Sequence, residues 1–258
     1  HELVRHVAQE GRYELAVERY GASAQAMHPF CAQLYEDGAV SAPRSRLREI
    51  GLDAERAMMD ATGGINTHRG AIWALGLASA AAGHRATSGE RSACSDILRQ
   101  NWGAEILGTP PEEATHGGRM RRLHGAGGAR IEAGWGFPTI RTVGVSALRQ
   151  GRALQPDDPE AARVQCCMAL IATLADTNLL YRGGPEGLRF AQGHARHFLK
   201  NGGVGQADWR QQAAIIHRDF VNHRLSPGGA ADGLALSLFL DRLDPALPHK
   251  QPPGSPTR

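Results

Sequence analysis

Four short polar segments, each containing glycine, lie at the ends of runs that are too apolar to face water. They are residues 63–70, 125–138, 176–185 and 226–232. If the apolar runs are helices that pack side by side, these ends can meet at one mouth. The side chains that would meet there are Asn66, Arg69, Arg130, Glu132, Asp176, Asn178, Arg182 and Asp232. The sequence therefore predicts one polar site built from helix ends.

This mixture of acids and arginines suits a polyphosphate that carries a metal ion. Carboxylate oxygens are ligands that Mg²⁺ prefers, and a guanidinium group binds phosphate oxygens two at a time. We therefore predict Mg²⁺ as the metal and Asp176 and Asp232 as its ligands. The structural alternative is that Asp176 caps a helix, Asp232 lies favourably at a helix dipole, and the arginines form ion pairs.

We expect the stretch 63–83 to lie at the centre of the fold, with the rest of the chain packed around it. Thr67 is a good N-cap, and residues 67–82 are apolar on nearly every face, which is typical of a helix enclosed on all sides. The polar head of this helix would reach the interior at the positive end of the helix dipole, where an anion can bind. The alternative is that the two glycines only turn the chain and Thr67 only caps.

The remaining pattern is helical throughout. Runs 159–176 and 230–240 are nearly as apolar as the first, and weaker helical patterns cover residues 47–58, 88–107, 139–148, 186–199 and 207–224. No β-branched run alternates with period two. We predict an all-α fold with one domain over residues 1–244, in which residues 1–27 have no strong pattern, and a disordered, proline-rich tail over residues 245–258.

Composition excludes several classes of protein. The net charge is +3, and 27 of the 29 basic residues are arginines spread along the chain rather than clustered, which argues against nucleic-acid binding. No segment approaches eighteen uninterrupted apolar residues, so no membrane span is expected. We expect a soluble cytoplasmic protein.

Five motifs resemble those of the triphosphoribosyl-dephospho-coenzyme A synthases, which make the prosthetic-group precursor of citrate lyase and malonate decarboxylase. The motifs occur in the family's order. The first three are Gly-Gly-Ile-Asn-Thr-His-Arg-Gly-Ala-Ile from Gly63, Gly-Ala-Arg-Ile-Glu-Ala from Gly128 with Gly-Phe-Pro from Gly136, and Asp-Thr-Asn-Leu-Leu-Tyr-Arg-Gly-Gly from Asp176. The last two are Phe-Leu-Lys-Asn-Gly-Gly from Phe198 and Leu-Ser-Pro-Gly-Gly-Ala-Ala-Asp from Leu225. Thr115-His-Gly and Gly187-Leu-Arg-Phe look more like the malonate decarboxylase branch.

The resemblance is weakest at the beginning of the chain. Family members open with Pro-Lys-Pro-Gly-Leu-Val and then Gly-Ala-His-x-Asp-Met, and residues 1–27 contain neither segment. Only Tyr20-Gly-Ala-Ser-Ala-Gln-Ala-Met is a trace of the second.

The resemblance implies a reaction between ATP and 3'-dephospho-coenzyme A. The 2'-hydroxyl of the coenzyme's ribose would attack C1' of ATP, adenine would leave, and the product, 2'-(5''-triphosphoribosyl)-3'-dephospho-coenzyme A, would pass to a phosphoribosyl-dephospho-CoA transferase that acts on an acyl-carrier subunit. Two alternatives remain open: a member that binds nucleotide or coenzyme A without turnover, and a nucleotide glycohydrolase.

Roles follow for the residues that match the motifs. A carboxylate suits the removal of the hydroxyl proton, so Glu132 or Asp176 is the predicted catalytic base. The residues predicted to bind substrate phosphates are Asn66, Thr67, His68, Arg69, Arg130, Asn178, Arg182, Gly183, Gly184, Ser226, Gly228 and Gly229.

Overall fold

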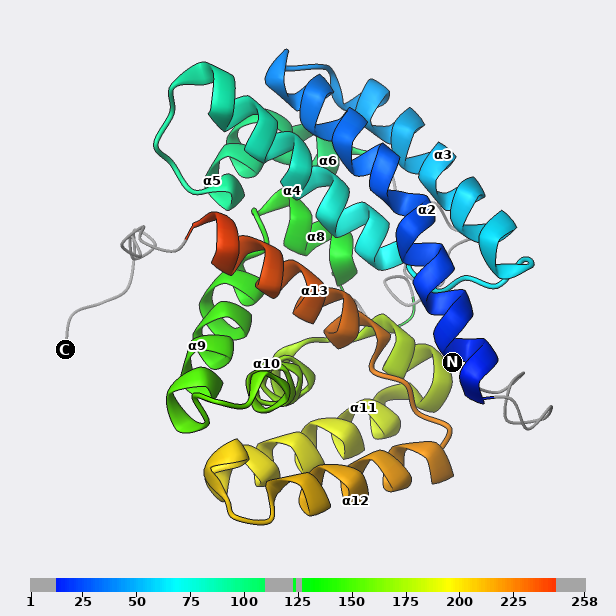
Figure 1. The fold of residues 1–258 in the computed structure, drawn as a ribbon, viewed down its shortest axis with the longest axis vertical. Coiled ribbons are helices and arrows are strands. Elements are labelled where there is room, and N and C mark those ends of the chain that lie inside the picture. The colour runs from blue at the N-terminus through cyan, green and yellow to red at the C-terminus, as the bar shows by residue number, and fades with distance from the viewer. Residues whose placement is uncertain (1–12, 110–122, 124–126, 245–258) are drawn as a thin grey trace.

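The computed structural model describes residues 13–109, 123 and 127–244. Every regular element within these residues is helical, which confirms the predicted all-α fold. Helices α2 (Tyr13–Ala39), α3 (Arg44–Thr62) and α4 (Arg69–Ser88) pack together on one side (Figure 1). The helices from α9 (Val145–Leu154) to α12 (Trp209–Asn222) lie on the other side, and α13 (Gly228–Leu243) runs between the two groups. One core cluster extends from Leu34 in α2 to Leu240 in α13.

Helix α4 (Arg69–Ser88) is the enclosed helix that the sequence predicted, and all of its residues from Gly76 to Gly83 are buried. Its small side chains let the backbone of α2 (Tyr13–Ala39) approach closely. A side chain at Gly83 would overlap the carbonyl of Tyr35, and one at Gly38 would overlap the carbonyl of Ala80. These contacts hold α2 parallel to α4, while α3 (Arg44–Thr62) packs against both.

The second group contains another strongly apolar helix, α10 (Pro159–Thr173), which has a proline in its first turn. Around it lie η2 (Ile140–Gly144), α9 (Val145–Leu154), α11 (Thr177–Lys200), η3 (Gly203–Gly205) and α12 (Trp209–Asn222). Figure 1 shows α11 and α12 side by side as a hairpin below α10.

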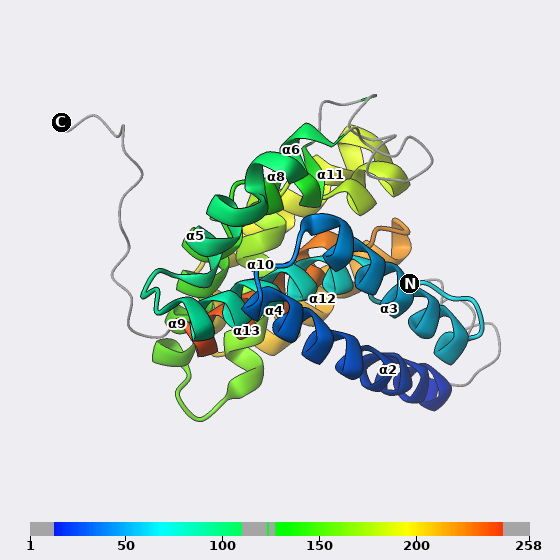
Figure 2. The same ribbon diagram turned by 90° about the horizontal axis from the view of Figure 1, so that it is seen from above.

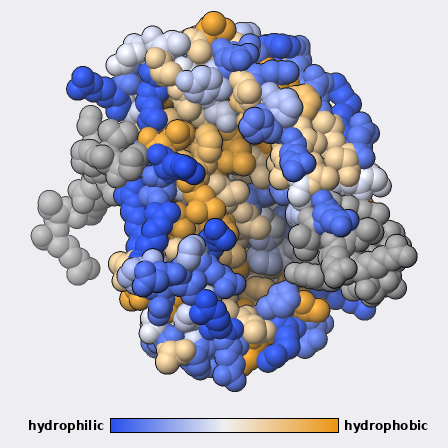
Figure 3. Space-filling view, in the orientation of Figure 1, coloured by the Kyte–Doolittle hydropathy of each residue, from blue (hydrophilic) through white to orange (hydrophobic). Residues whose placement is uncertain are grey.

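Helix α13 (Gly228–Leu243) contacts α4, α9, α10 and α11. It is less enclosed than predicted, because Leu234, Leu238 and Phe239 are only partly buried. Figure 3 shows an apolar band along its course and a hollow beside its first turns. At the other end of the helix, Asp241 accepts hydrogen bonds from Arg149 and Arg152 of α9.

A short helical layer covers the side of the molecule opposite α2. It consists of α5 (Cys94–Leu98), the π-helical turn η1 (Arg99–Gly103), α6 (Ala104–Gly108) and α8 (Gly128–Gly134). Figure 2 shows α6 and α8 on the same side as α11, with α4 and α13 between this layer and α2. Residue 128 comes close to Thr177, where α11 begins.

Several predicted boundaries are wrong. Helix α4 continues through Ser88, so the helix predicted over 88–107 begins only at Cys94. The polar segment 176–185, after which the next helix was predicted to begin, is itself mostly helical, because α11 begins at Thr177 and merely bends at Gly184, where φ is 60°. Residues 1–12, most of the segment 110–126 and the predicted tail lie outside the described residues.

Among the helices of the described residues, none alone is long and apolar enough to cross a bilayer. The pair α10 and α11 meets the length and composition criteria only when joined, and it is bent by 59°.

Candidate functional site

The polar site lies where the N-termini of α4, α11 and α13 meet. Asp176, in the link between α10 and α11, accepts a hydrogen bond from the Ala230 N–H of α13 at 3.1 Å. Asp232, in the second turn of α13, accepts one from the Ala71 N–H of α4. Two carboxylates thus connect three helix N-termini. Because Asp176 follows the end of α10, the polar ends of the three apolar helices α4, α10 and α13 meet here, as the sequence predicted.

Asp176 is the more enclosed of the two carboxylates, and its side chain is saturated with hydrogen bonds. It is 3% exposed. Its Oδ1 accepts from the N–H groups of Asn178 at 2.8 Å and Leu179 at 3.4 Å, and the N–H groups of Ala230 and Gly229 also donate to the carboxylate. Burial raises the pKa of Asp176, and these four donors oppose the rise. Because a carboxylate has about four lone-pair sites, Asp176 has little capacity left for a ligand.

Asp232 differs from Asp176 in its surroundings. It is half-buried, and within the described part of the chain the Ala71 N–H is the one backbone donor that opposes its protonation. Burial first, and then the negative charge of Asp176, raise the pKa of Asp232 to about 7. Asp232 therefore changes its charge near neutral pH, and the residues that the structure describes leave lone pairs on it for another partner.

Three glycines allow the polar side chains to lie against backbone at this junction. A side chain at Gly70 would overlap the carboxylate of Asp232. A Cβ at Gly228 would lie 2.5 Å from Nδ2 of Asn178, and a Cβ at Gly229 would lie 3.0 Å from the carboxylate of Asp176. The predicted residues Asn178, Gly228 and Gly229 are therefore brought together with both carboxylates.

Helix α2 adds two residues that sequence reasoning missed. The hydroxyl of Ser23 is buried and lies 2.8 Å from both the Thr67 hydroxyl and Nδ1 of His68. The ring of Tyr20 packs edge-on against that of His68, with centroids 5.3 Å apart. Burial and then the charge of Asp232 raise the pKa of Tyr20, which places its phenol near that carboxylate. The available signal was the trace of a family motif that begins at Tyr20.

The start of α4 differs in detail from the prediction. Thr67 is not the N-cap, because its hydroxyl is bonded to Ser23 and to His68. The side chain of Asn66 instead accepts a hydrogen bond from the Arg69 N–H at 3.1 Å. Burial lowers the pKa of His68, so its ring is neutral at pH 7.

Three predicted residues are bonded elsewhere. The Nε of Arg69 lies 2.9 Å from Glu55 of α3. Nη1 of Arg130 donates to the carbonyls of Ile106, Leu107 and Thr109 at the end of α6. Glu132 accepts from the N–H and the hydroxyl of Thr139, at 3.1 and 2.7 Å, at the start of the helix that leads into α9. These contacts stabilise helix ends, so the geometry favours structural roles for Arg130 and Glu132.

The remaining predicted residues lie along the bend of α11 and before α13. Arg182 is half-buried one turn after Asn178, and no hydrogen bond or ion pair joins it to another residue in the part of the chain that the structure describes. Gly183 packs against the buried Leu225, and the bend itself is at Gly184. Ser226 is buried just ahead of the α13 N-terminus.

The two aspartates do not fit a metal site held by the protein. Backbone N–H groups already bond both oxygens of Asp176, so Asp232 is the one of the two that is better able to offer an oxygen. Within the described ranges, no three His, Cys, Asp or Glu side chains are grouped so that they could hold a metal ion. We therefore assign no Mg²⁺ ligand to this chain.

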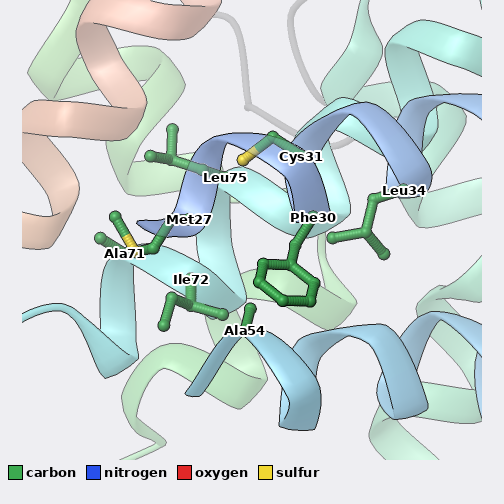
Figure 4. Close-up of a pocket in the computed structure, with 8 residues that line it drawn as sticks. All are labelled: Met27, Phe30, Cys31, Leu34, Ala54, Ala71, Ile72 and Leu75. Atoms are coloured by element: carbon green, nitrogen blue, oxygen red, sulfur yellow. The ribbon is translucent and has the colours of Figure 1, made fainter. Parts of the chain in front are cut away.

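A small apolar cavity of about 10 Å³ lies directly behind the site, between α2, α3 and α4 (Figure 4). Its lining residues are Met27, Phe30, Cys31, Leu34, Ala54, Ala71, Ile72 and Leu75. Ala71 belongs to both places, because its side chain lines the cavity while its N–H donates to Asp232. This space is close to that of one water molecule, so it cannot admit a nucleotide.

The contacts of Arg130 give a prediction. Arg130→Ala should remove a charged donor from three carbonyls, destabilise the fold by about 1–3 kcal/mol and lower the melting temperature by several degrees. Affinity for ATP should stay within about threefold. Thermal unfolding and ATP titration on the same protein check this, and an unchanged melting temperature with tenfold weaker ATP binding would support a phosphate clamp instead.

Comparisons with known proteins agree on one family. The family model described as ATP:dephospho-CoA triphosphoribosyl transferase matches residues 6–251. A probable 2-(5''-triphosphoribosyl)-3'-dephosphocoenzyme-A synthase of Stutzerimonas stutzeri is 39% identical over 87% of this chain and 79% of its own length. A protein of the same name from Azotobacter vinelandii is 40% identical over 91% of this chain and 82% of its own length. No solved structure matches the chain.

Proposed function

Because the chain belongs to the ATP:dephospho-CoA triphosphoribosyl transferase family and is therefore a transferase, we propose that it joins ATP to 3'-dephospho-coenzyme A. In this reaction the 2'-hydroxyl of the coenzyme's ribose attacks C1' of ATP. Adenine leaves, and the triphosphate remains on the transferred ribose. The product is 2'-(5''-triphosphoribosyl)-3'-dephospho-coenzyme A.

The observation that carries this proposal is the junction of three helix N-termini at Asp176 and Asp232. Helix N-termini carry partial positive charge and attract phosphate oxygens. Arg182 supplies a full positive charge one turn from the junction, and Asn178 supplies an amide next to Gly228. We assign the triphosphate to this side of the junction, with Ser226, Gly229 and the loop residues Asn66, Thr67 and His68 as further contacts.

Displacement at C1' passes through a state in which positive charge develops on the ribose. A rigidly held triphosphate and a nearby carboxylate both favour that state over the bound substrates. The junction offers both: an arginine and helix N-termini for the phosphates, and two carboxylates within one hydrogen-bonded cluster.

Mg²⁺ enters this proposal only with the nucleotide. The ion would arrive on the ATP phosphates, with phosphate and water oxygens as its ligands, and it would neutralise part of their charge.

We further propose a cytoplasmic enzyme whose product supplies the prosthetic group of malonate decarboxylase through a second transferase. The likeness of Thr115-His-Gly and Gly187-Leu-Arg-Phe to that branch supports this assignment.

The experiment that tests the function measures adenine. The protein should release adenine from ATP only when 3'-dephospho-coenzyme A is present, with one adenine for each coupled product detected by mass spectrometry. Equal release without the coenzyme would identify a nucleotide glycohydrolase. ATP or coenzyme binding without any adenine would identify a member that does not turn over, an outcome consistent with Ser23 at the histidine position of the family's second N-terminal motif.

A further inference from the structure

The proposed reaction requires a group that removes the proton of the attacking hydroxyl, and the structure distinguishes among three carboxylates. Asp176 accepts from four backbone N–H groups and is almost fully buried. Glu132 bonds Thr139 through both of its oxygens. Asp232 accepts from one backbone N–H and remains half-buried. It is the only one of the three with oxygens free for a substrate.

We propose that Asp232 is the catalytic base that accepts the proton of the attacking 2'-hydroxyl, an inference that rests on the proposed function. Its position is fixed by the surrounding backbone. The carboxylate lies against Gly70, where any side chain would overlap it, and the Ala71 N–H holds it in place. A base must be held within hydrogen-bond reach of the proton it removes, and a short side chain fixed in this way meets that need.

The charged and titratable groups around Asp232 set its pKa for the role of a base. Asp176 faces it from the start of α11, Tyr20 from α2, and the Ala71 N–H from α4. Burial and the charge of Asp176 raise its pKa to about 7, so at neutral pH a large fraction is ionised and yet binds a proton readily. Tyr20, whose ring packs against that of the neutral His68, adds no negative charge at this pH.

The bonds and protons in this step balance. The O–H bond of the 2'-hydroxyl breaks, and its proton moves to a carboxylate oxygen of Asp232. The oxygen's electron pair forms the new bond to C1' of ATP, while the bond from C1' to N9 of adenine breaks and its electron pair leaves with the base. Adenine takes a proton from water, and Asp232 returns its proton to solvent before the next turnover.

The test is Asp232→Asn, which keeps the shape and an oxygen that can accept from Ala71. Turnover should fall by about 10²- to 10⁴-fold, with KM for ATP and for the coenzyme changed by less than about threefold. In the wild type, kcat/KM should rise with pH up to about 7 and then level off, because the base must be ionised. The residual kcat/KM of the variant should not show this rise with pH.

The melting temperature of the variant at high pH distinguishes a catalytic base from a residue whose role is only structural. A carboxyl group whose folded pKa is raised contributes stability that is complete below its unfolded pKa, near 3.8, and is lost as pH rises through about 7. Asp232→Asn removes that loss, so at pH 8 its melting temperature should equal or exceed that of the wild type. A clear fall in melting temperature together with normal turnover per folded molecule would overturn the proposal.

Two further variants keep the test specific. Gly70→Ala should leave the fold intact, since alanine is favoured in a helix, yet lower turnover at least tenfold by displacing the carboxylate. Asp241→Asn, on the same helix but bonded to Arg149 and Arg152, should keep the wild-type kcat. If the wild type itself forms no product, the proposed function fails. If it is active and Asp232→Asn matches it, only the assignment of the base fails.

Discussion

Replacing Asp176 by asparagine should destabilise the fold by about 3–5 kcal/mol and lower the melting temperature by roughly 10 °C. The carboxylate accepts N–H groups from both α11 and α13 in a buried setting. Asparagine keeps one oxygen but turns an amide NH₂ toward the remaining N–H groups, which leaves buried donors without acceptors at about 1–3 kcal/mol each. Thermal and denaturant unfolding of the two proteins measure the difference.

The matched control is Asp158→Asn. Asp158 caps α10 by accepting from the N–H groups of Glu160 and Ala161, so it connects to one helix N-terminus where Asp176 connects two. Asparagine is nearly as good an N-cap as aspartate, and the ion pair of Asp158 with the exposed Arg210 contributes little, so the loss should stay below about 1 kcal/mol. An Asp176→Asn protein as stable as the wild type but without turnover would restore Asp176 as the catalytic base that the sequence suggested.

Replacing Arg182 by alanine should weaken ATP binding about ten- to a hundredfold with little change in stability. Arg182 is half-buried and has no ion-pair partner among the residues that the structure describes, so its removal leaves no buried charge unpaired. A charge-assisted hydrogen bond to phosphate contributes roughly 1.5–3 kcal/mol, which corresponds to that loss of affinity. Isothermal titration with ATP, beside thermal unfolding, measures both effects.

Arg189→Ala is the control for charge alone. Arg189 is exposed, lies on α11 beyond the bend at Gly184, and pairs only weakly with Glu186 at 4.0 Å. Removing it changes the net charge by the same amount, so ATP affinity should change by less than about threefold at physiological salt. Equal losses in the two variants would show that Arg182 acts through general charge, and the assignment of the triphosphate to α11 would then be wrong.

Much of the fold followed from the sequence because helical periodicity is a local property. The apolar run after Thr67 predicted the enclosed helix α4, and the absence of period-two alternation predicted the all-α class. The glycine-containing polar segments also identified the ends of the apolar helices. The predicted helix boundaries were less accurate, since α4 extends to Ser88 and α11 begins at Thr177. Caps and packing override local preference at these positions.

Residue type and family motif together selected the candidate site residues, but only the tertiary structure decided their partners. Two arginines from the family motifs have different partners: Arg130 donates to the end of α6, while Arg182 has no hydrogen bond or ion pair within the described residues. The two aspartates also differ in their partners, because four backbone N–H groups donate to Asp176 and one donates to Asp232. A hydrogen bond depends on which groups from distant segments come within about 3 Å, and no spacing along one helix specifies that.

The sequence by itself determined the helices, the buried character of α4 and α10, and the family whose motifs lie at the helix ends. Tertiary structure alone brought Tyr20 and Ser23 of α2 to His68 and Thr67, and it set Asp232 between the N-terminus of α4 and Asp176. The physical reason is that helix formation depends on contacts three and four residues apart. The charge state and free lone pairs of a carboxylate instead depend on burial and on neighbours from other helices.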